Sequence, residues 1–191
     1  MLAVDAIQFT VASIRKKTVK NLSVMEHVKN KSSQPQVNQS IHFRALGTTY
    51  KVLSSSVNGS AAIVEHTLEA KSIGAPMHKH TFEDEISYVL EGNLSVVQNG
   101  EIQTAGVGEY IVKPRGIFHT FWNAGSERIR FIEVFSPGNF ENYFFEIAPF
   151  LQADQPLQLD KISAIVAKYG LIMDMPAGVE IIKKYGLNAL S

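Results

Sequence analysis

The sequence predicts an all-β barrel or sandwich that is followed by a helical extension. Between about residues 41 and 136, short runs rich in Val, Ile, Tyr, Phe and Thr recur, such as EISYVL, LSVVQ and IRFIEVF. Turn signals, among them NGS, EGN, GVG and NAGS, separate these runs. Strands this short, with turns this frequent, are typical of β-sandwiches and β-barrels.

The composition along the chain predicts three segments. Residues 1–40 are a basic arm and linker that ends in the polar tract KNKSSQPQVNQS. Residues 41–136 form the β-domain. Residues 137–191 form the extension, because Pro137-Gly138 ends the last strand and apolar residues then recur at helical spacing in NFENYFFEIAPFL, LDKISAIVAKYG and VEIIKKYG.

One hairpin is predicted with particular clarity inside the β-domain. Asn99-Gly100 lies between the strand-like runs LSVVQ and EIQTA. A two-residue type I′ turn needs positive φ at both central residues, and Asn-Gly is the pair that adopts it most readily. We therefore expect two antiparallel strands on either side of this pair.

Composition excludes several classes of protein. The chain has 191 residues, with 18 Lys+Arg against 18 Asp+Glu, so its formal net charge is zero and no field steers it onto nucleic acid or an anionic membrane. It contains no cysteine, which excludes disulfides and thiolate metal sites. No apolar run is long enough to span a bilayer. We expect a cytoplasmic protein without nucleic-acid or membrane partners.

The segment MHKHTFEDE carries the first candidate metal ligands. His78 and His80 are two residues apart, so in a strand both imidazoles lie on one face. Such a pair alone is weak support, because a strand histidine is more often a hydrogen-bonded residue than a ligand. His119 adds support, since it follows the turn Pro114-Arg115-Gly116 in a strand that a barrel can bring beside the first two.

These residues resemble the two motifs of the cupin superfamily. The first motif, His-x-His, then Glu, then Gly, is matched by His78, His80, Glu85 and Gly92. The second, Gly, Pro-x-Gly, His and Asn, is matched by Gly108, Pro114 to Gly116, His119 and Asn123. One position departs from the pattern: Ser72 stands where the family usually has a glycine, and the nearest glycine is Gly74.

The resemblance implies a double-stranded β-helix, the jelly-roll barrel of cupins, with a metal held by His78, His80, Glu85 and His119. It selects Glu85 among three adjacent acids, and strand geometry favours the same choice, since Glu85 opens the run EISYVL. Glu83 and Asp84 are interpreted as solvated loop acids. The other acids considered are interpreted as surface or sheet-edge charges: Glu101, Glu109, Glu127 and Glu133. His66 lies on a strand of undetermined phase, and we interpret it as an ordinary strand histidine, with a position in the pocket as the alternative.

The ligand set implies one divalent transition metal per chain, and Fe, Mn, Ni, Co, Cu and Zn all suit nitrogen and oxygen ligands. Phe121 follows His119 at i+2, and Val89 shares the face of Glu85, so both are expected to line an apolar substrate pocket.

The chain looks most similar to small single-domain cupins of the quercetin-dioxygenase-like group. That resemblance implies a dioxygenase-like oxidoreductase acting on a small hydrophobic or aromatic, flavonol-like enol, with Glu85 as both ligand and catalytic base. The alternatives are a metal-dependent isomerase or lyase, or a cupin that binds a small molecule without reaction. Cupins commonly dimerise, so a homodimer is expected as well.

Overall fold

A computed structural model describes residues 34–152 and 155–188. Residues 1–33, which make up most of the predicted basic arm, lie outside the described residues, as does His27. The described elements are β1 (Ser40–Phe43), β2 (Leu46–Val52), η1 (Ser54–Val57), β3 (Ala62–Leu68), β4 (Ser72–Ile73), β5 (His78–His80), β6 (Asp84–Glu91), β7 (Leu94–Gln98), β8 (Glu101–Ala105), β9 (Tyr110–Lys113), β10 (His119–Asn123), β11 (Ile129–Ser136), α2 (Glu141–Ile147), η2 (Ala148–Phe150), α3 (Leu159–Lys168), β12 (Leu171–Met173) and α4 (Met175–Tyr185).

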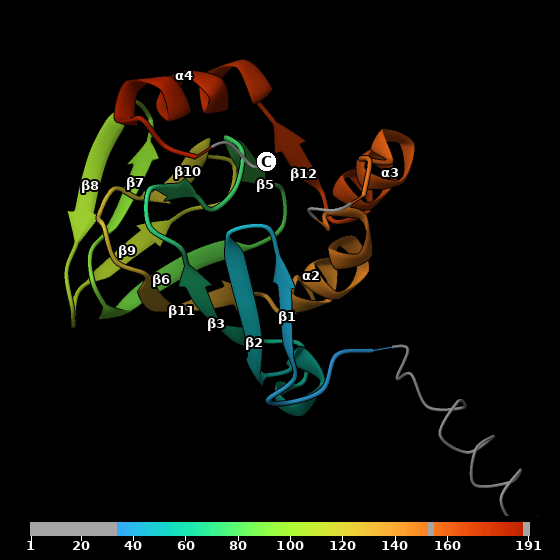
Figure 1. The fold of residues 1–191 in the computed structure, drawn as a ribbon. Coiled ribbons are helices and arrows are strands. Elements are labelled where there is room, and N and C mark those ends of the chain that lie inside the picture. The colour runs from blue at the N-terminus through green and yellow to red at the C-terminus, as the bar shows by residue number, and fades with distance from the viewer. Residues whose placement is uncertain (1–33, 153–154, 189–191) are drawn as a thin grey trace, which may run out of the picture. The chain divides into compact units, whose positions relative to one another are not determined.

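The strands form two antiparallel sheets that face each other as a jelly-roll barrel, which confirms the predicted fold class (Figure 1). The first sheet has the strand order β1-β2-β3-β11-β6-β9. The second has the order β12-β5-β10-β7-β8, with β4 also paired to β10. Neighbours in each sheet are often far apart in the sequence, so the barrel brings the two predicted motifs together.

Alternation along the strands separates the core from the surface. In β6 and β11 every second residue is buried, as expected for strands with one face on a core. The rings of Phe121 and Phe131 meet edge to face across the two sheets, 5.6 Å apart between centroids. The predicted hairpin is also confirmed: Gln98 pairs with Glu101, and Asn99 and Gly100 have φ of 51° and 77°.

The C-terminal extension is less purely helical than predicted. It contains α2, α3 and α4, but it also contains the short strand β12, which the helical patterns did not indicate. β12 joins the second sheet beside β5, with Leu171 opposite His80 and Met173 opposite His78. α4 lies across the second sheet, where Ile181, Ile182 and Tyr185 pack near Trp122 (Figure 1).

In the described part of the chain, no helix has both the length and the apolar character needed to cross a bilayer.

Candidate metal centre

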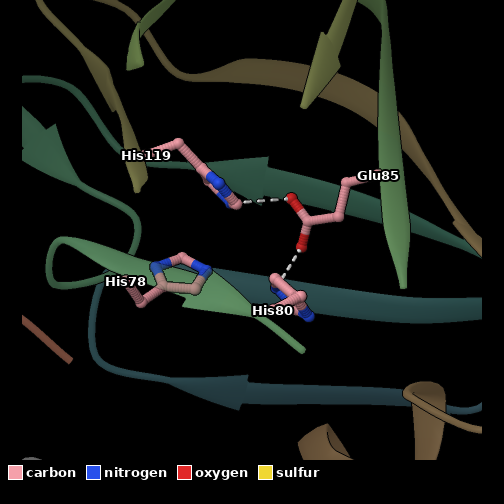
Figure 2. Close-up of side chains that lie close together, drawn as sticks. All are labelled: His78, His80, Glu85 and His119. Carbon is pink, nitrogen blue, oxygen red and sulfur yellow. Dashed lines mark ion pairs between the residues drawn. The ribbon is translucent and has the colours of Figure 1, made fainter. Parts of the chain in front are cut away.

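Two paired strands of the second sheet, β5 and β10, and one strand of the first sheet, β6, bring the predicted ligands together. His78 and His80 stand at the two ends of β5, and both side chains are buried. His119 opens β10 directly opposite His78, and Glu85 is the second residue of β6. One ligand atom from each of these residues lies within 4.8 Å of the others (Figure 2). The predicted set of three histidines and one glutamate therefore converges at one point inside the barrel.

The Glu85 carboxylate lies between two of the imidazoles. Its Oε1 is 2.8 Å from Nε2 of His80, and its Oε2 is 3.3 Å from Nε2 of His119 (Figure 2). The rings of His78 and His119 are 4.5 Å apart between centroids. The Nε2 atoms of His80 and His119 and Oε2 of Glu85 are buried and make no hydrogen bond within the described residues.

The other nitrogen of each imidazole has a partner. Nδ1 of His78 lies 2.7 Å from the Pro76 carbonyl, and Nδ1 of His119 lies 3.0 Å from the Ile117 carbonyl. A carbonyl only accepts, so each Nδ1 carries a hydrogen and Nε2 is the ring nitrogen left for a metal. Metal-binding histidines are held in this way by partners on the far nitrogen. The donor set of three imidazoles and one carboxylate, which converge on one point, therefore fits a divalent metal.

The Pro-Arg-Gly turn holds β5 in position. Gly116 has φ of 78°, a left-handed conformation that glycine adopts without strain, and its N–H donates to the carbonyl of His80 at 2.8 Å. The turn that leads into the strand of His119 is thus bonded to the strand of the other two histidines.

Glu83 is not the solvated loop acid that the sequence predicted. Its side chain is buried, and its Oε2 lies 3.3 Å from Nδ1 of His80. Asp84 does face solvent, where it pairs with the Arg115 guanidinium at 2.6 Å. The chain bends just before β6, so the first acid turns inward beneath His80 while the second turns outward. Sequence spacing alone does not show that bend.

The interpretation of Glu133 as a surface charge was also wrong. Glu133 lies on the buried face of β11 between Phe131 and Phe135, and its side chain is almost fully buried. Ser87 donates to both of its carboxylate oxygens at 3.1 Å, and Lys113 Nζ lies 3.0 Å from Oε2. The apolar residues at i−2 and i+2 were the signal for an inward phase. The other acids assigned to the surface are exposed: Glu101, Glu109 and Glu127.

Lys113 is a part of the centre that sequence reasoning missed. It lies opposite Glu85 in the pairing of β6 with β9, it is fully buried, and its Nζ is 2.6 Å from Oε2 of Glu85. The alternation in YIVK, with Ile111 and Lys113 on one face, was the available signal. The centre therefore contains a buried cation between two carboxylates.

The buried charges set the protonation of the site. Burial raises the pKa of the Glu85 carboxyl, but Lys113 and His80 outweigh it, so this pKa lies well below its usual range. Burial lowers the pKa of His80, but the Glu85 and Glu83 carboxylates outweigh it and raise this pKa to about 9. Burial raises the pKa of Glu133 to about 7 against the charge of Lys113. A metal at Nε2 of His80 therefore displaces a proton on binding.

The centre opens onto a cavity of about 570 Å³ with a mostly apolar lining. His78, Glu85 and Glu133 stand among its lining residues, and helices α2 and α3 contribute aromatic and aliphatic side chains. Phe121 lines the cavity as expected. Val89 is buried in the core and is not among the lining residues.

His66 also lines this cavity, so its side chain points from β3 into the interior of the barrel. Its Nδ1 lies 3.0 Å from the Thr48 hydroxyl, and its ring packs on Phe131 and Phe144 at 5.2 Å. Burial lowers its pKa to about 4, so the imidazole is neutral at pH 7.

Comparison with protein families found a match, which lies in the β-region. Residues 64–135 match the family model of the Cupin domain. This segment holds the whole candidate metal centre. Comparison with curated proteins found no match.

Solved cupin-like structures resemble about half of the chain. KdgF from Halomonas sp. is 22% identical over 51% of this chain and 83% of its own, with a TM-score of 0.45. A predicted oxalate decarboxylase from Thermotoga maritima is 21% identical over 56% of this chain and 96% of its own, with a TM-score of 0.48. A putative ethanolamine utilization protein Q from Salmonella typhimurium is 29% identical over 49% of this chain and 71% of its own, with a TM-score of 0.41. Likeness at this level assigns no activity to this chain.

Proposed function

We propose that this chain is a metal-dependent cupin enzyme that carries out oxygen-dependent chemistry on a small hydrophobic or aromatic enol, such as a flavonol. The observation that carries the proposal is that two of the four converging ligand residues, His78 and Glu85, line a mostly apolar cavity. A ligand set with coordination positions left open is the mark of a catalytic metal site. The cavity volume of about 570 Å³ falls in the range of small-molecule sites.

The residues of the chain would divide the work between holding the metal and moving a proton. His78, His80 and His119 would bind through Nε2, and Glu85 through its carboxylate. A bound ion would supply a Lewis acid and, if it is redox-active, a route to dioxygen. Glu85 is ionised at neutral pH and could accept the hydroxyl proton of an enol, and its lowered pKa makes it a weak base for that step.

The apolar lining of the cavity would determine which substrates bind. Phe121, Phe135 and Phe140 line it close to the centre, and the ring of Phe140 lies 4.4 Å from that of His80. Aromatic faces beside the ligands favour a flat, apolar body over a phosphorylated one, and they keep water away from the reacting group.

A second candidate is a metal-dependent isomerase or lyase, for which the metal serves only as a Lewis acid. The observation in its favour is the buried pair of Lys113 and Glu133 beside Glu85, since proton transfer needs groups of this kind.

Elemental analysis combined with oxygen uptake tests the proposal. The wild-type chain, purified without added metal, is expected to hold about one transition metal per chain, and a His78→Ala/His119→Ala double variant is expected to hold none. His42→Ala is the matched control, because His42 is an exposed histidine of β1. Oxygen uptake with flavonols and other enols then separates the candidates: zinc with no uptake favours the isomerase or lyase, and no metal even after reconstitution contradicts both.

The expected homodimer stays a prediction.

A further inference from the structure

We propose that Lys113 is a positioning residue that engages Oε2 of Glu85, so that Glu85 binds the metal through Oε1 alone and one coordination position stays open. The proposal rests on the proposed metal-dependent function and adds a residue to it.

The first observation is the placement of the ammonium. Lys113 and Glu85 stand directly opposite each other on β9 and β6, and side chains in directly opposed positions of antiparallel strands lie close together. Nζ of Lys113 lies 2.6 Å from Oε2 of Glu85, and neither side chain reaches solvent. A buried ion pair at this distance is screened little by water, so it competes with a metal for that oxygen.

The second observation is that the Lys113 ammonium also contacts a second carboxylate, that of Glu133. Glu133 Oε2 lies 3.0 Å from the same Nζ, and Ser87 donates to both oxygens of Glu133. The Phe121 ring lies 5.1 Å from Nζ and covers another side of the ammonium. Lys113 therefore cannot swing away from Glu85 without leaving Glu133 as an unpaired buried charge.

The third observation is the difference between the two oxygens of Glu85. Oε1 lies 2.8 Å from Nε2 of His80, which is the shorter of the two contacts that Glu85 makes with the imidazoles. Oε2 is shared between the Lys113 ammonium and Nε2 of His119, at 2.6 and 3.3 Å. Because the ammonium occupies Oε2, we assign Oε1 as the oxygen that would bind the metal. An ion that is held by three imidazoles and one oxygen has room for substrate or water.

The test measures binding of Co(II), whose visible absorption is strong at low coordination number and weakens as that number rises. Lys113→Met is expected to bind Co(II) about tenfold more tightly than the wild-type chain, because a positive charge near the ion is removed. Its visible absorption is expected to weaken, because both oxygens of Glu85 become free to bind. Affinity is measured by competition with a chromophoric chelator.

Two further variants keep the test decisive. Lys113→Met/Glu133→Gln removes the ammonium without leaving Glu133 as an unpaired carboxylate, so it guards against a folding defect in the single variant. It is expected to show the same tighter binding and weaker absorption. Lys51→Met is the matched control, because Lys51 forms a comparable ion pair with Glu65 at 2.9 Å on the outer side of the barrel. It is expected to match the wild-type chain.

The outcomes separate this inference from the proposed function. If the wild-type chain binds Co(II) and the two Lys113 variants bind it equally well or more weakly, with unchanged absorption, Lys113 only neutralises Glu133 and the inference is wrong. If the wild-type chain binds no Co(II), Mn(II), Fe(II) or Zn(II), the proposed function fails, and the inference fails with it.

Discussion

The Glu83 carboxylate lies 3.3 Å from Nδ1 of His80, while Nε2 of the same ring lies 2.8 Å from Oε1 of Glu85. His80 is thus held by acids on both nitrogens. The two other histidines have backbone carbonyls on Nδ1, so His80 is the histidine of the centre whose far nitrogen depends on a side chain. Because this partner is a side chain, the role of Glu83 can be tested by substitution.

Glu83→Ala is expected to weaken metal binding by about 10- to 100-fold, because the imidazole of His80 loses the partner that orients it and raises its basicity. Asp84→Asn is the matched control, since Asp84 is the neighbouring acid and faces solvent. Metal affinity is measured by chelator competition. Equal affinity in the two variants would show that Glu83 does not support His80.

The stability of the metal-free protein is expected to fall between about pH 6.5 and pH 4 in part because of His66. Burial lowers its pKa to about 4 in the folded chain, whereas an unfolded histidine takes a proton below about 6.5. The contribution of the neutral His66 to the free energy of unfolding is therefore fully present above pH 6.5. It falls by about 3 kcal/mol as the pH decreases toward 4.

Urea unfolding of the wild-type chain and of His66→Gln across this range measures the contribution. Glutamine does not titrate and can still bond to the Thr48 hydroxyl, so the gap in stability between the two proteins should narrow as the pH falls. Parallel curves would show that His66 contributes nothing to the acid sensitivity.

The strand β12 is expected to support the metal centre from the edge of the second sheet. β5 pairs with β10 only through His78 and His119, whereas it pairs with β12 along its whole length. Leu171→Ala removes a buried side chain opposite His80 and is expected to lower the free energy of unfolding by about 2–5 kcal/mol. Metal affinity is expected to fall with it.

Ile172→Ala is the control for this experiment, because Ile172 is the next residue of β12 and is half exposed. It is expected to change stability much less. The measurements are urea unfolding and metal titration. A Leu171→Ala variant with wild-type affinity would show that β5 holds its histidines without help from the extension.

The sequence by itself determined the barrel and its four candidate ligands. Period-2 alternation and turn residues depend on local backbone chemistry, so the β-domain and the hairpin at Asn99-Gly100 could be predicted without any contact between distant residues. The ligand residues His78, His80, Glu85 and His119 could be named because the two motifs keep fixed spacings along the chain.

Only the tertiary structure decided what surrounds those ligands. Glu83, Lys113 and Glu133 are charged residues whose usual place is the surface, and their burial follows from partners that the barrel brings from other strands. The strand β12 likewise forms because β5 offers it an unpaired edge, which no local pattern in the extension reveals. Local chemistry sets the strands, and long-range pairing places these charges inside the barrel.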